Sequence, residues 1–386
     1  MDFAYGEEHE AVRELAGRIF DEQSTHDRLK AVEEAAGPEG PFDRDLWSAL
    51  ADAGLLGIGL PEDVGGAGLD FLAACLVVEA AGRTAAHVPV VETLAYGAAA
   101  VDRFGTAEQR QAWLPRIAGG QAVVTAALAE LVGDVVLPGG AAPATTATPD
   151  AGGWRLDGAK ACVPAGLVAD AVLVPATVVA DGDHPAGTAV FVVPTDAAGV
   201  TRTRQDGPAV PEALLELSGV VVGDDARLGG PEADGAAVVA SIAEHATAAL
   251  CVQEAGVTAA SVALISEYTK TREQFGKPIA TFQAVGQRAA DAYVDAEAIR
   301  LTAWQAAWRL SAGLPATAEV AVAKFWAADG GQRVVHAAAH LHGGVGVDRD
   351  YPLHRYFLLT RQIELTLGGA HDSLARLGAV LAADPA

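Results

Sequence analysis

The hydrophobic pattern of this chain changes twice along its length, and these changes constrain the fold more than any other feature. Up to Gly120 apolar residues recur at spacings of three and four, which predicts amphipathic helices. From Gln121 to about Gly230 the pattern becomes short valine-rich runs separated by Gly, Pro and Asp. Such runs predict strands, and we expect them at 171–174, 189–193 and 219–222.

After Pro231 long helical patterns return at 237–273, 281–312 and 315–342, and a last helix begins near Ala370. Four helices of this length suit an antiparallel bundle. We therefore expect an α+β chain that is mainly α, with three domains. These are an N-terminal helical domain over 1–120, a central β domain over 121–230 and a C-terminal helical bundle over 231–386.

Two local predictions concern the central β domain. The stretch from Pro138 to Gly153 is rich in Ala, Thr, Pro and Gly, and we expect it to be a surface loop. A hairpin turn is predicted at Asp157-Gly158, because this dipeptide lies between two runs of strand-like residues.

Charge and composition exclude several classes of function. The formal net charge of −24 argues against binding to nucleic acid or to an anionic membrane. The apolar run Ala246–Ile265 contains Gln253 and Glu254, so we expect a buried helix there and no membrane span. The segment Met1–Glu8 lacks the features of a signal peptide, and a cytoplasmic location is expected.

The cysteines do not indicate a metal site. Cys75, Cys162 and Cys251 are far apart and lack the paired spacing of zinc ligands. We expect all three to be small buried residues in a reducing compartment.

Two segments in the last third of the chain carry the clearest signal of function. The first is Thr271–Gln283, with the letters TREQFGKPIATFQ, and the second is His342–Gly346, with the letters HGGVG, followed by Asp350-Tyr351-Pro352. The guanidinium of Arg272 is suited to phosphate oxygens, and adjacent glycines allow close approach of a ligand to the backbone. Together these segments resemble the acyl-CoA dehydrogenase family.

The resemblance implies a fold, a cofactor and a set of binding residues. Members have a helical domain, a β domain and a helical bundle, in the order predicted here. They bind FAD, and their equivalents of the residues in these two segments reach across a subunit interface to the pyrophosphate and adenosine half of the cofactor. The residues of this chain at those positions are Arg272, Phe275, Gln283, His340, Gly343 and Gly344.

The catalytic base of the family is missing from both of its usual positions. Related enzymes use a glutamate before the last helix or one on the helix that opens the bundle, and these positions hold Leu367 and Ala246 here. Glu364 is the candidate for a displaced base. His371 and Asp372 also lie near this point, but we favour a surface role for His371 and a helix-dipole role for Asp372.

The half of the site that faces the flavin ring in related enzymes also differs. The family's hydroxyl-rich loop corresponds to Ala129–Asp134, which has no hydroxyl groups, and its Trp-x-Thr strand becomes Cys162-Val163-Pro164. The resemblance is therefore to the base-lacking subunit of actinobacterial α2β2 enzymes of steroid catabolism. Such a subunit clamps FAD while a paralogous partner supplies the base and the flavin pocket.

This resemblance implies an acyl-CoA substrate, an acceptor similar to electron-transfer flavoprotein and a paralogous partner. Two alternatives stay open: a self-sufficient homotetramer that uses Glu364, and a structural paralogue that binds neither flavin nor thioester. Small apolar residues on the C-terminal helices also predict a tetramer interface made by Val285, Ala289, Ala292, Ala296, Ala321, Phe325 and Ala328.

Overall fold

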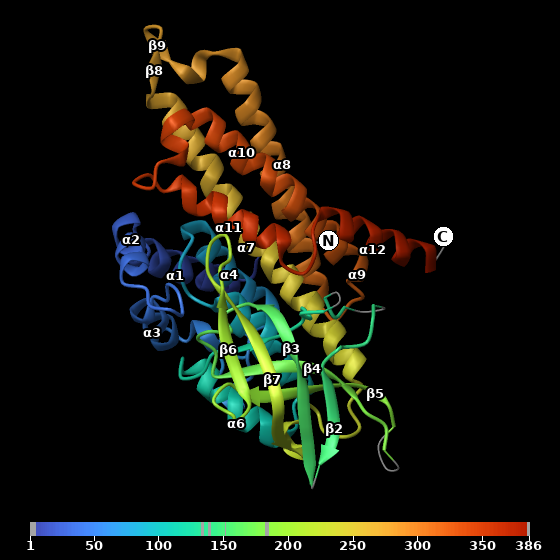
Figure 1. The fold of residues 1–386 in the computed structure, drawn as a ribbon. Coiled ribbons are helices and arrows are strands. Elements are labelled where there is room, and N and C mark those ends of the chain that lie inside the picture. The colour runs from blue at the N-terminus through green and yellow to red at the C-terminus, as the bar shows by residue number, and fades with distance from the viewer. Residues whose placement is uncertain (1–4, 133–134, 138–139, 151, 182–184, 384–386) are drawn as a thin grey trace. The chain divides into compact units, whose positions relative to one another are not determined.

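The structure is a computed structural model that describes residues 5–132, 135–137, 140–150, 152–181 and 185–383 (Figure 1). These residues belong to two compact units. The first, here called the helical unit, comprises Met1–Ala31, Cys75–His87 and Thr247–Ala386. The second, here called the sheet unit, comprises Val32–Ala74 and Val88–Ala246. Helices α2, α4 and α7 contribute residues to both units, and the two predicted boundaries between the three domains stay a prediction.

The helical unit confirms the predicted C-terminal helices. The predicted segment 237–273 is α7, and 281–312 is α8. The predicted segment 315–342 is interrupted by the π-helix η6, so that it forms α9 and α10. The helices are α1 (Glu7–Gln23), α2 (His26–Glu34), α4 (Phe71–Thr84), α7 (Gly235–Thr271), α8 (Gln283–Ser311), α9 (Thr317–Phe325), η6 (Trp326–Gly330), α10 (Gly331–His342), α11 (Leu353–Leu365) and α12 (Ala370–Ala383).

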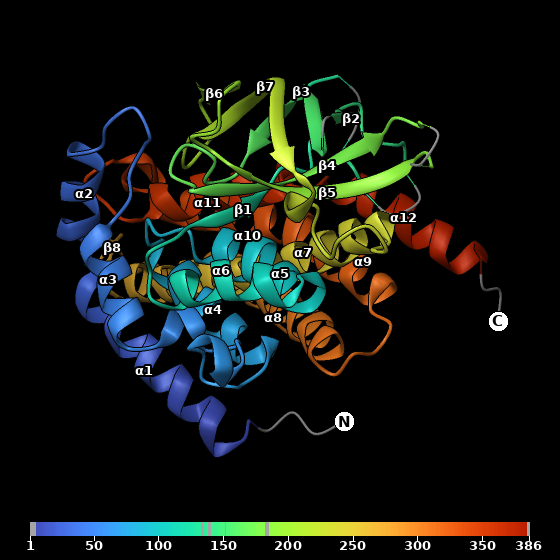
Figure 2. The ribbon, with the colours of Figure 1, turned by 90° about the horizontal axis from the view of Figure 1, so that it is seen from below.

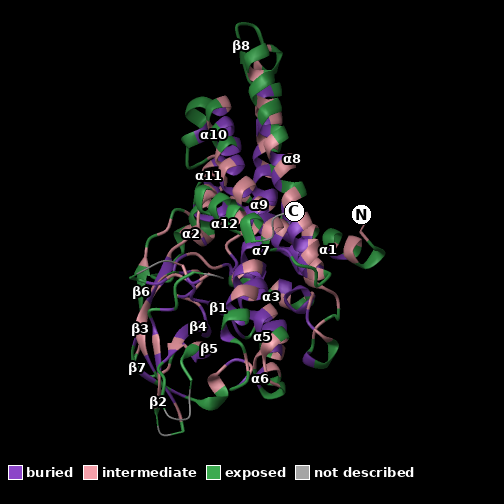
Figure 3. Ribbon diagram, turned by 90° about the vertical axis from the view of Figure 1, so that its right-hand side faces the viewer, coloured by how far each residue is buried: buried purple, intermediate pink, exposed green. Residues whose placement is uncertain are grey.

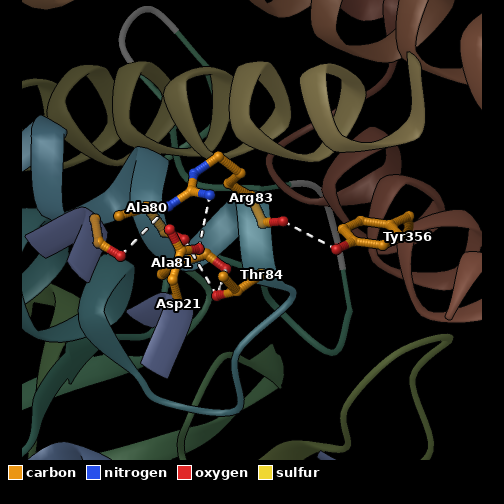
Figure 4. A network of polar contacts seen from close by, with 7 residues as sticks. Asp21, Ala80, Ala81, Arg83, Thr84 and Tyr356 are labelled. Atoms are coloured by element: carbon orange, nitrogen blue, oxygen red, sulfur yellow. Dashed lines mark hydrogen bonds and ion pairs between the residues drawn. The ribbon is translucent and has the colours of Figure 1, made fainter. Parts of the chain in front are cut away.

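Glycines allow α4 and α7 to pack with their backbones in contact. A Cβ atom on Gly82 would lie 2.1 Å from the carbonyl oxygen of Gln253, and one on Gly256 would lie 2.2 Å from that of Glu79. Arg83 adds polar contacts, since its guanidinium pairs with Asp21 at 2.7 Å and its carbonyl accepts from the Tyr356 hydroxyl at 2.9 Å (Figure 4). Arg83 thus connects α1, α4 and α11.

Four of the seven residues predicted to form a tetramer interface lie inside the helical unit, so the prediction is wrong for these four. Ala292, Ala296, Ala321 and Ala328 are buried within the single chain. Val285, Ala289 and Phe325 are half-buried, and an interface role for them stays a prediction. Ala292 packs with Ile265, Ala337, Ala338 and Leu353 in one apolar cluster. Small residues here allow close packing between helices of the same bundle, and the exposed apolar side chains of α8 are Tyr293, Val294 and Leu301.

The sheet unit contains short helices and one curled sheet (Figure 2). Its strand order is β1-β4-β2-β3-β7-β6, and β5 pairs with β4. The helical elements are α3 (Arg44–Asp52), η1 (Leu55–Gly57), η2 (Glu62–Val64), η3 (Glu92–Ala98), α5 (Ala99–Phe104), α6 (Ala107–Ala118) and η4 (Asp224–Ala226). The strands are β1 (Val124–Ala126), β2 (Thr146–Asp150), β3 (Gly153–Val163), β4 (Ala171–Val178), β5 (Gly187–Pro194), β6 (Val200–Gln205) and β7 (Glu212–Gly223).

The three predicted strands are confirmed within β4, β5 and β7. The two local predictions for this region are wrong. Strand β2 lies within the predicted loop, of which Pro138, Gly139 and Ala151 are outside the described residues. Asp157-Gly158 is not a turn, because β3 continues through it with a bulge against β7 between Leu156 and Gly158. Asp157 and Gly158 are residue types that favour turns, but here they lie at a bulge within a continuous strand.

Among the described residues, α7 is the one helix that is long and apolar enough to cross a membrane. Of the most apolar stretch of α7, 72% is buried inside the structure, as expected for the predicted core helix.

Candidate functional site: a groove at the end of the helical unit

Four of the six predicted cofactor residues line one groove of about 530 Å³ in the helical unit. They are Arg272, His340, Gly343 and Gly344. The remaining lining residues come from the same two stretches of chain and are Tyr268, Gln274, Ile279, Leu341, His342, Val345 and Asp348. The structure therefore brings the two sequence segments together, although about 70 residues separate them in the chain.

The other two predicted residues lie beside the groove and do not line it. Phe275 is at the tip of the hairpin formed by β8 (Glu273–Gln274) and β9 (Lys277–Pro278), and Gln283 is the first residue of α8. Figure 1 shows this hairpin at the end of α7 and α8, and Figure 3 shows that the hairpin and the adjoining turn of α8 are exposed.

Arg272 follows α7 and is exposed in the single chain. Its backbone is held by hydrogen bonds to Tyr268 and Ile279, each of 2.8 Å. Within the described parts of the chain its guanidinium makes no ion pair, so its donors are available to a ligand.

The glycine pair forms the turn where α10 ends and the short helix η7 (Gly343–Val347) begins. Gly343 has φ 60° and ψ −135°, a conformation that requires glycine. A Cβ atom on Gly344 would meet nothing within 4 Å. Packing within this chain therefore does not explain the absence of a side chain at 344, whereas close approach of a ligand or partner would.

The hairpin tip exposes an aromatic residue in a strained conformation. Phe275 has φ 55° and Gly276 has φ 76°, which are the positive values of a type I′ turn. The Phe275 side chain is 92% exposed, and its ring contacts Phe282 edge-on with 6.1 Å between centroids. A strained and exposed phenylalanine does not serve the stability of the single chain, so we interpret it as a contact for another molecule.

The described residues at the two usual positions of the base provide no proton acceptor. Leu367 is buried, with φ 61°, and its carbonyl accepts a 2.9 Å hydrogen bond from Arg376. Ala246 is fully buried in α7. The displaced-base candidate Glu364 pairs with Arg361 at 2.5 Å on α11.

The surface readings of the two neighbouring residues are confirmed. His371 and Asp372 are exposed at the start of α12, and Asp372 accepts a 2.8 Å hydrogen bond from the Gly369 amide.

In the sheet unit, the segment predicted to correspond to the flavin loop is occupied by other contacts. Buried Glu130 pairs with buried Lys160 and accepts a 3.2 Å hydrogen bond from Thr145. Leu131 and Val132 are 51% and 79% exposed, while Gly133 and Asp134 lie outside the described residues. The described part of this segment offers no hydroxyl donor to a flavin ring.

One cysteine prediction is wrong. Cys75 and Cys251 are buried as expected, but Cys162 is exposed and has φ 48°. Partial burial and the nearby Glu212 carboxylate raise the pKa of the Cys162 thiol, which disfavours a reactive thiolate. Among the described residues no cluster of His, Cys, Asp and Glu is arranged to hold a metal ion.

Comparison with known proteins places this geometry in context. Residues 6–121 match the family model of the acyl-CoA dehydrogenase N-terminal domain, and residues 233–378 match that of the C-terminal domain. The chain is 38% identical to acyl-CoA dehydrogenase FadE27 of Mycobacterium tuberculosis, over 100% of both chains.

Two solved structures are also similar. A chain of the ChsE4–ChsE5 complex from Mycobacterium tuberculosis has a TM-score of 0.91 and 39% identity, over 100% of both chains. A chain of the Tcur3481–Tcur3483 steroid ACAD has a TM-score of 0.88 and 42% identity, over 98% of both chains.

Proposed function

Because this chain belongs to the acyl-CoA dehydrogenase family, we propose that it is one subunit of a heteromeric, FAD-dependent acyl-CoA dehydrogenase. Members of the family are oxidoreductases that act on the CH–CH bond of an acyl-CoA. This chain would contribute the groove that clamps the diphosphate and adenosine half of FAD, and a paralogous subunit would supply the base. The observation that carries the proposal is the unpaired Arg272 guanidinium facing an open glycine turn in one exposed groove.

The residues of the groove fit part of a dinucleotide. The Arg272 guanidinium would donate to diphosphate oxygens, and the bare backbone at Gly344 would allow the cofactor to approach closely. Phe275 would cover the cofactor or its neighbouring subunit from the hairpin. FAD supplies the hydride acceptor when bound, and in this proposal the proton is removed by a residue of the partner.

The comparisons support a heteromeric assembly. The ChsE4–ChsE5 structure is a complex of two proteins, and the Tcur3481–Tcur3483 steroid ACAD also has two named components. We extend this to the present chain as an α2β2 arrangement that acts on an acyl-CoA with a bulky, steroid-like acyl group. Its electrons would pass to an acceptor of the electron-transfer flavoprotein type.

The two alternative functions differ from the proposed one in the colour expected of the purified protein. A self-sufficient homotetramer would be yellow when purified alone, but the Glu364 side chain is engaged by the Arg361 guanidinium in the structure. A structural paralogue would stay colourless with any partner. The subunit proposed here becomes yellow only when it is co-expressed with its paralogous partner.

The test replaces Arg272 with alanine in that co-expressed complex. A charge-assisted hydrogen bond contributes about 1.5–3 kcal/mol, so Arg272→Ala should weaken FAD binding by about 10- to 100-fold. The matched control is Arg18→Ala, which removes an exposed arginine of α1 in the same unit outside the groove. FAD occupancy is measured at limiting FAD. Equal occupancy in Arg272→Ala, Arg18→Ala and the unsubstituted complex would contradict the assignment.

A further inference from the structure

A buried imidazole forms part of the wall of the groove. His342 is the last residue of α10, it is 2% exposed, and Gly343 follows it. Its ring stacks on Tyr268 of α7, with 4.4 Å between centroids and 27° between planes. The Tyr351 ring lies on another side, with 5.2 Å between centroids. His342 and Tyr351 lie in the second of the two sequence segments, and neither is among the six residues predicted to contact FAD.

The hydrogen bonds of His342 define its tautomer. Nδ1 lies 2.8 Å from the carbonyl oxygen of Ala338, which can only accept, so Nδ1 carries the proton. Nε2 is 3.1 Å from the Tyr351 hydroxyl and must then accept from it. Burial lowers the pKa of His342, against the opposing effect of the Ala338 and Leu264 carbonyls, and so favours the neutral form of the ring.

Three segments that line or adjoin the groove meet at the His342 ring. Tyr268 lies one helical turn before Arg272, and its carbonyl accepts the Arg272 amide at 2.8 Å. His342 is bonded to the glycine turn. Tyr351 belongs to the segment after η7, and its amide donates to the carbonyl of the groove residue Asp348 at 3.2 Å.

We propose that His342 is a positioning residue of the cofactor groove, whose neutral ring locks the end of α10 to the end of α7 so that Gly343 and Gly344 stay opposite Arg272. It does not touch the cofactor itself in this role. The inference rests on the proposed function, because it requires that the groove hold the diphosphate half of FAD.

A pair of tyrosine variants separates positioning from stability. Tyr351→Phe removes the hydroxyl that donates to His342 and keeps the ring. Tyr356→Phe removes the hydroxyl that donates to the Arg83 carbonyl at 2.9 Å, in the same unit and outside the groove lining (Figure 4). Each variant loses one neutral hydrogen bond, so the melting temperatures of the isolated chains should fall by similar amounts.

The two variants should differ in their affinity for FAD in the assembled complex. We expect the dissociation constant to rise about fivefold for Tyr351→Phe and to change by less than about twofold for Tyr356→Phe. His342→Phe keeps a ring on Tyr268 and loses both hydrogen bonds, so it should weaken FAD binding at least as much as Tyr351→Phe. Should His342→Phe fail to fold, the tyrosine pair alone decides.

Arg272→Ala is measured in parallel so that the two proposals can fail separately. If Arg272→Ala weakens FAD binding while both tyrosine variants bind FAD equally, the positioning role of His342 is overturned and the proposed function stands. If Arg272→Ala has no effect either, the groove does not hold FAD and the proposed function fails.

Discussion

A carboxyl group in the core of the helical unit should make this protein less stable as pH rises from mildly acidic to neutral. Glu254 of α7 is fully buried. One of its oxygens accepts from the Thr360 hydroxyl at 2.8 Å, and the other, Oε2, has no hydrogen-bond partner in the described structure. Burial raises the pKa of Glu254 from 4.5 to about 8, against the opposing effects of Thr360 and Lys324.

The sign and the magnitude follow from proton linkage. A carboxyl whose pKa is raised in the folded state contributes stability that is complete below its unfolded pKa and is lost as pH rises through the folded value. Between about pH 5.5 and 7.5 Glu254 takes up nearly one proton on folding, so its contribution should lower the free energy of unfolding by about 2–3 kcal/mol. The pKa of Lys324, which burial lowers to about 8, lies above this window, so Lys324 contributes less to the pH dependence there than Glu254 does.

The assay is urea unfolding of the isolated chain at both ends of that window. Glu254→Gln retains a carbonyl oxygen for Thr360 and cannot titrate. Between the two pH values, the free energy of unfolding of this variant should therefore fall by about 2–3 kcal/mol less than that of the unsubstituted chain. Glu14→Gln, on the exposed face of α1, controls for the loss of one carboxylate. Parallel pH dependence in the unsubstituted chain and in Glu254→Gln would refute the reasoning.

Two further predictions concern the site. Gly344→Ala should leave the melting temperature of the isolated chain unchanged, because the added Cβ meets nothing within 4 Å. The same variant should lower the flavin absorbance of the assembled complex. A lower melting temperature would show that Gly344 serves packing. Leu367→Glu should not allow an acyl-CoA to bleach flavin in the isolated chain, because the described part of the segment Ala129–Asp134 still has no hydroxyl donors. Bleaching would show that the chain has a working flavin pocket of its own.

The sequence predicted the long C-terminal helices well, because helix formation depends on local signals. Hydrophobic periodicity placed α7 and α8 within about two residues of their ends, and the paired motifs placed Arg272 and Gly343 in one groove. Periodicity does not say which partner an apolar face has. The alanine face of α8 was therefore assigned to another subunit, although Ala292 packs against α10 in the same chain.

Polar residues in the core were harder to predict. Glu254 lies in an alanine-rich helix, and nothing local indicates that Thr360, more than a hundred residues away, accompanies it inside the fold. The exposure of Cys162 likewise depends on the positive φ at that residue, which its residue type does not suggest. Such features depend on tertiary contacts, which one sequence does not display.

Replacing Phe275 should change the stability of the isolated chain and the FAD retention of the complex in opposite directions. Asn-Gly is the favoured dipeptide of a type I′ turn, whereas Phe275 at φ 55° is strained by about 1 kcal/mol. Phe275→Asn should therefore raise the melting temperature of the isolated chain while lowering FAD retention in the complex, because the 92% exposed ring is lost. Phe282→Leu keeps Phe275 and is the control for the edge-on contact between the two rings. If Phe275→Asn lowered stability, or raised it with no loss of FAD, the exposed ring would have no role in binding, and the strain at this turn would need another cause.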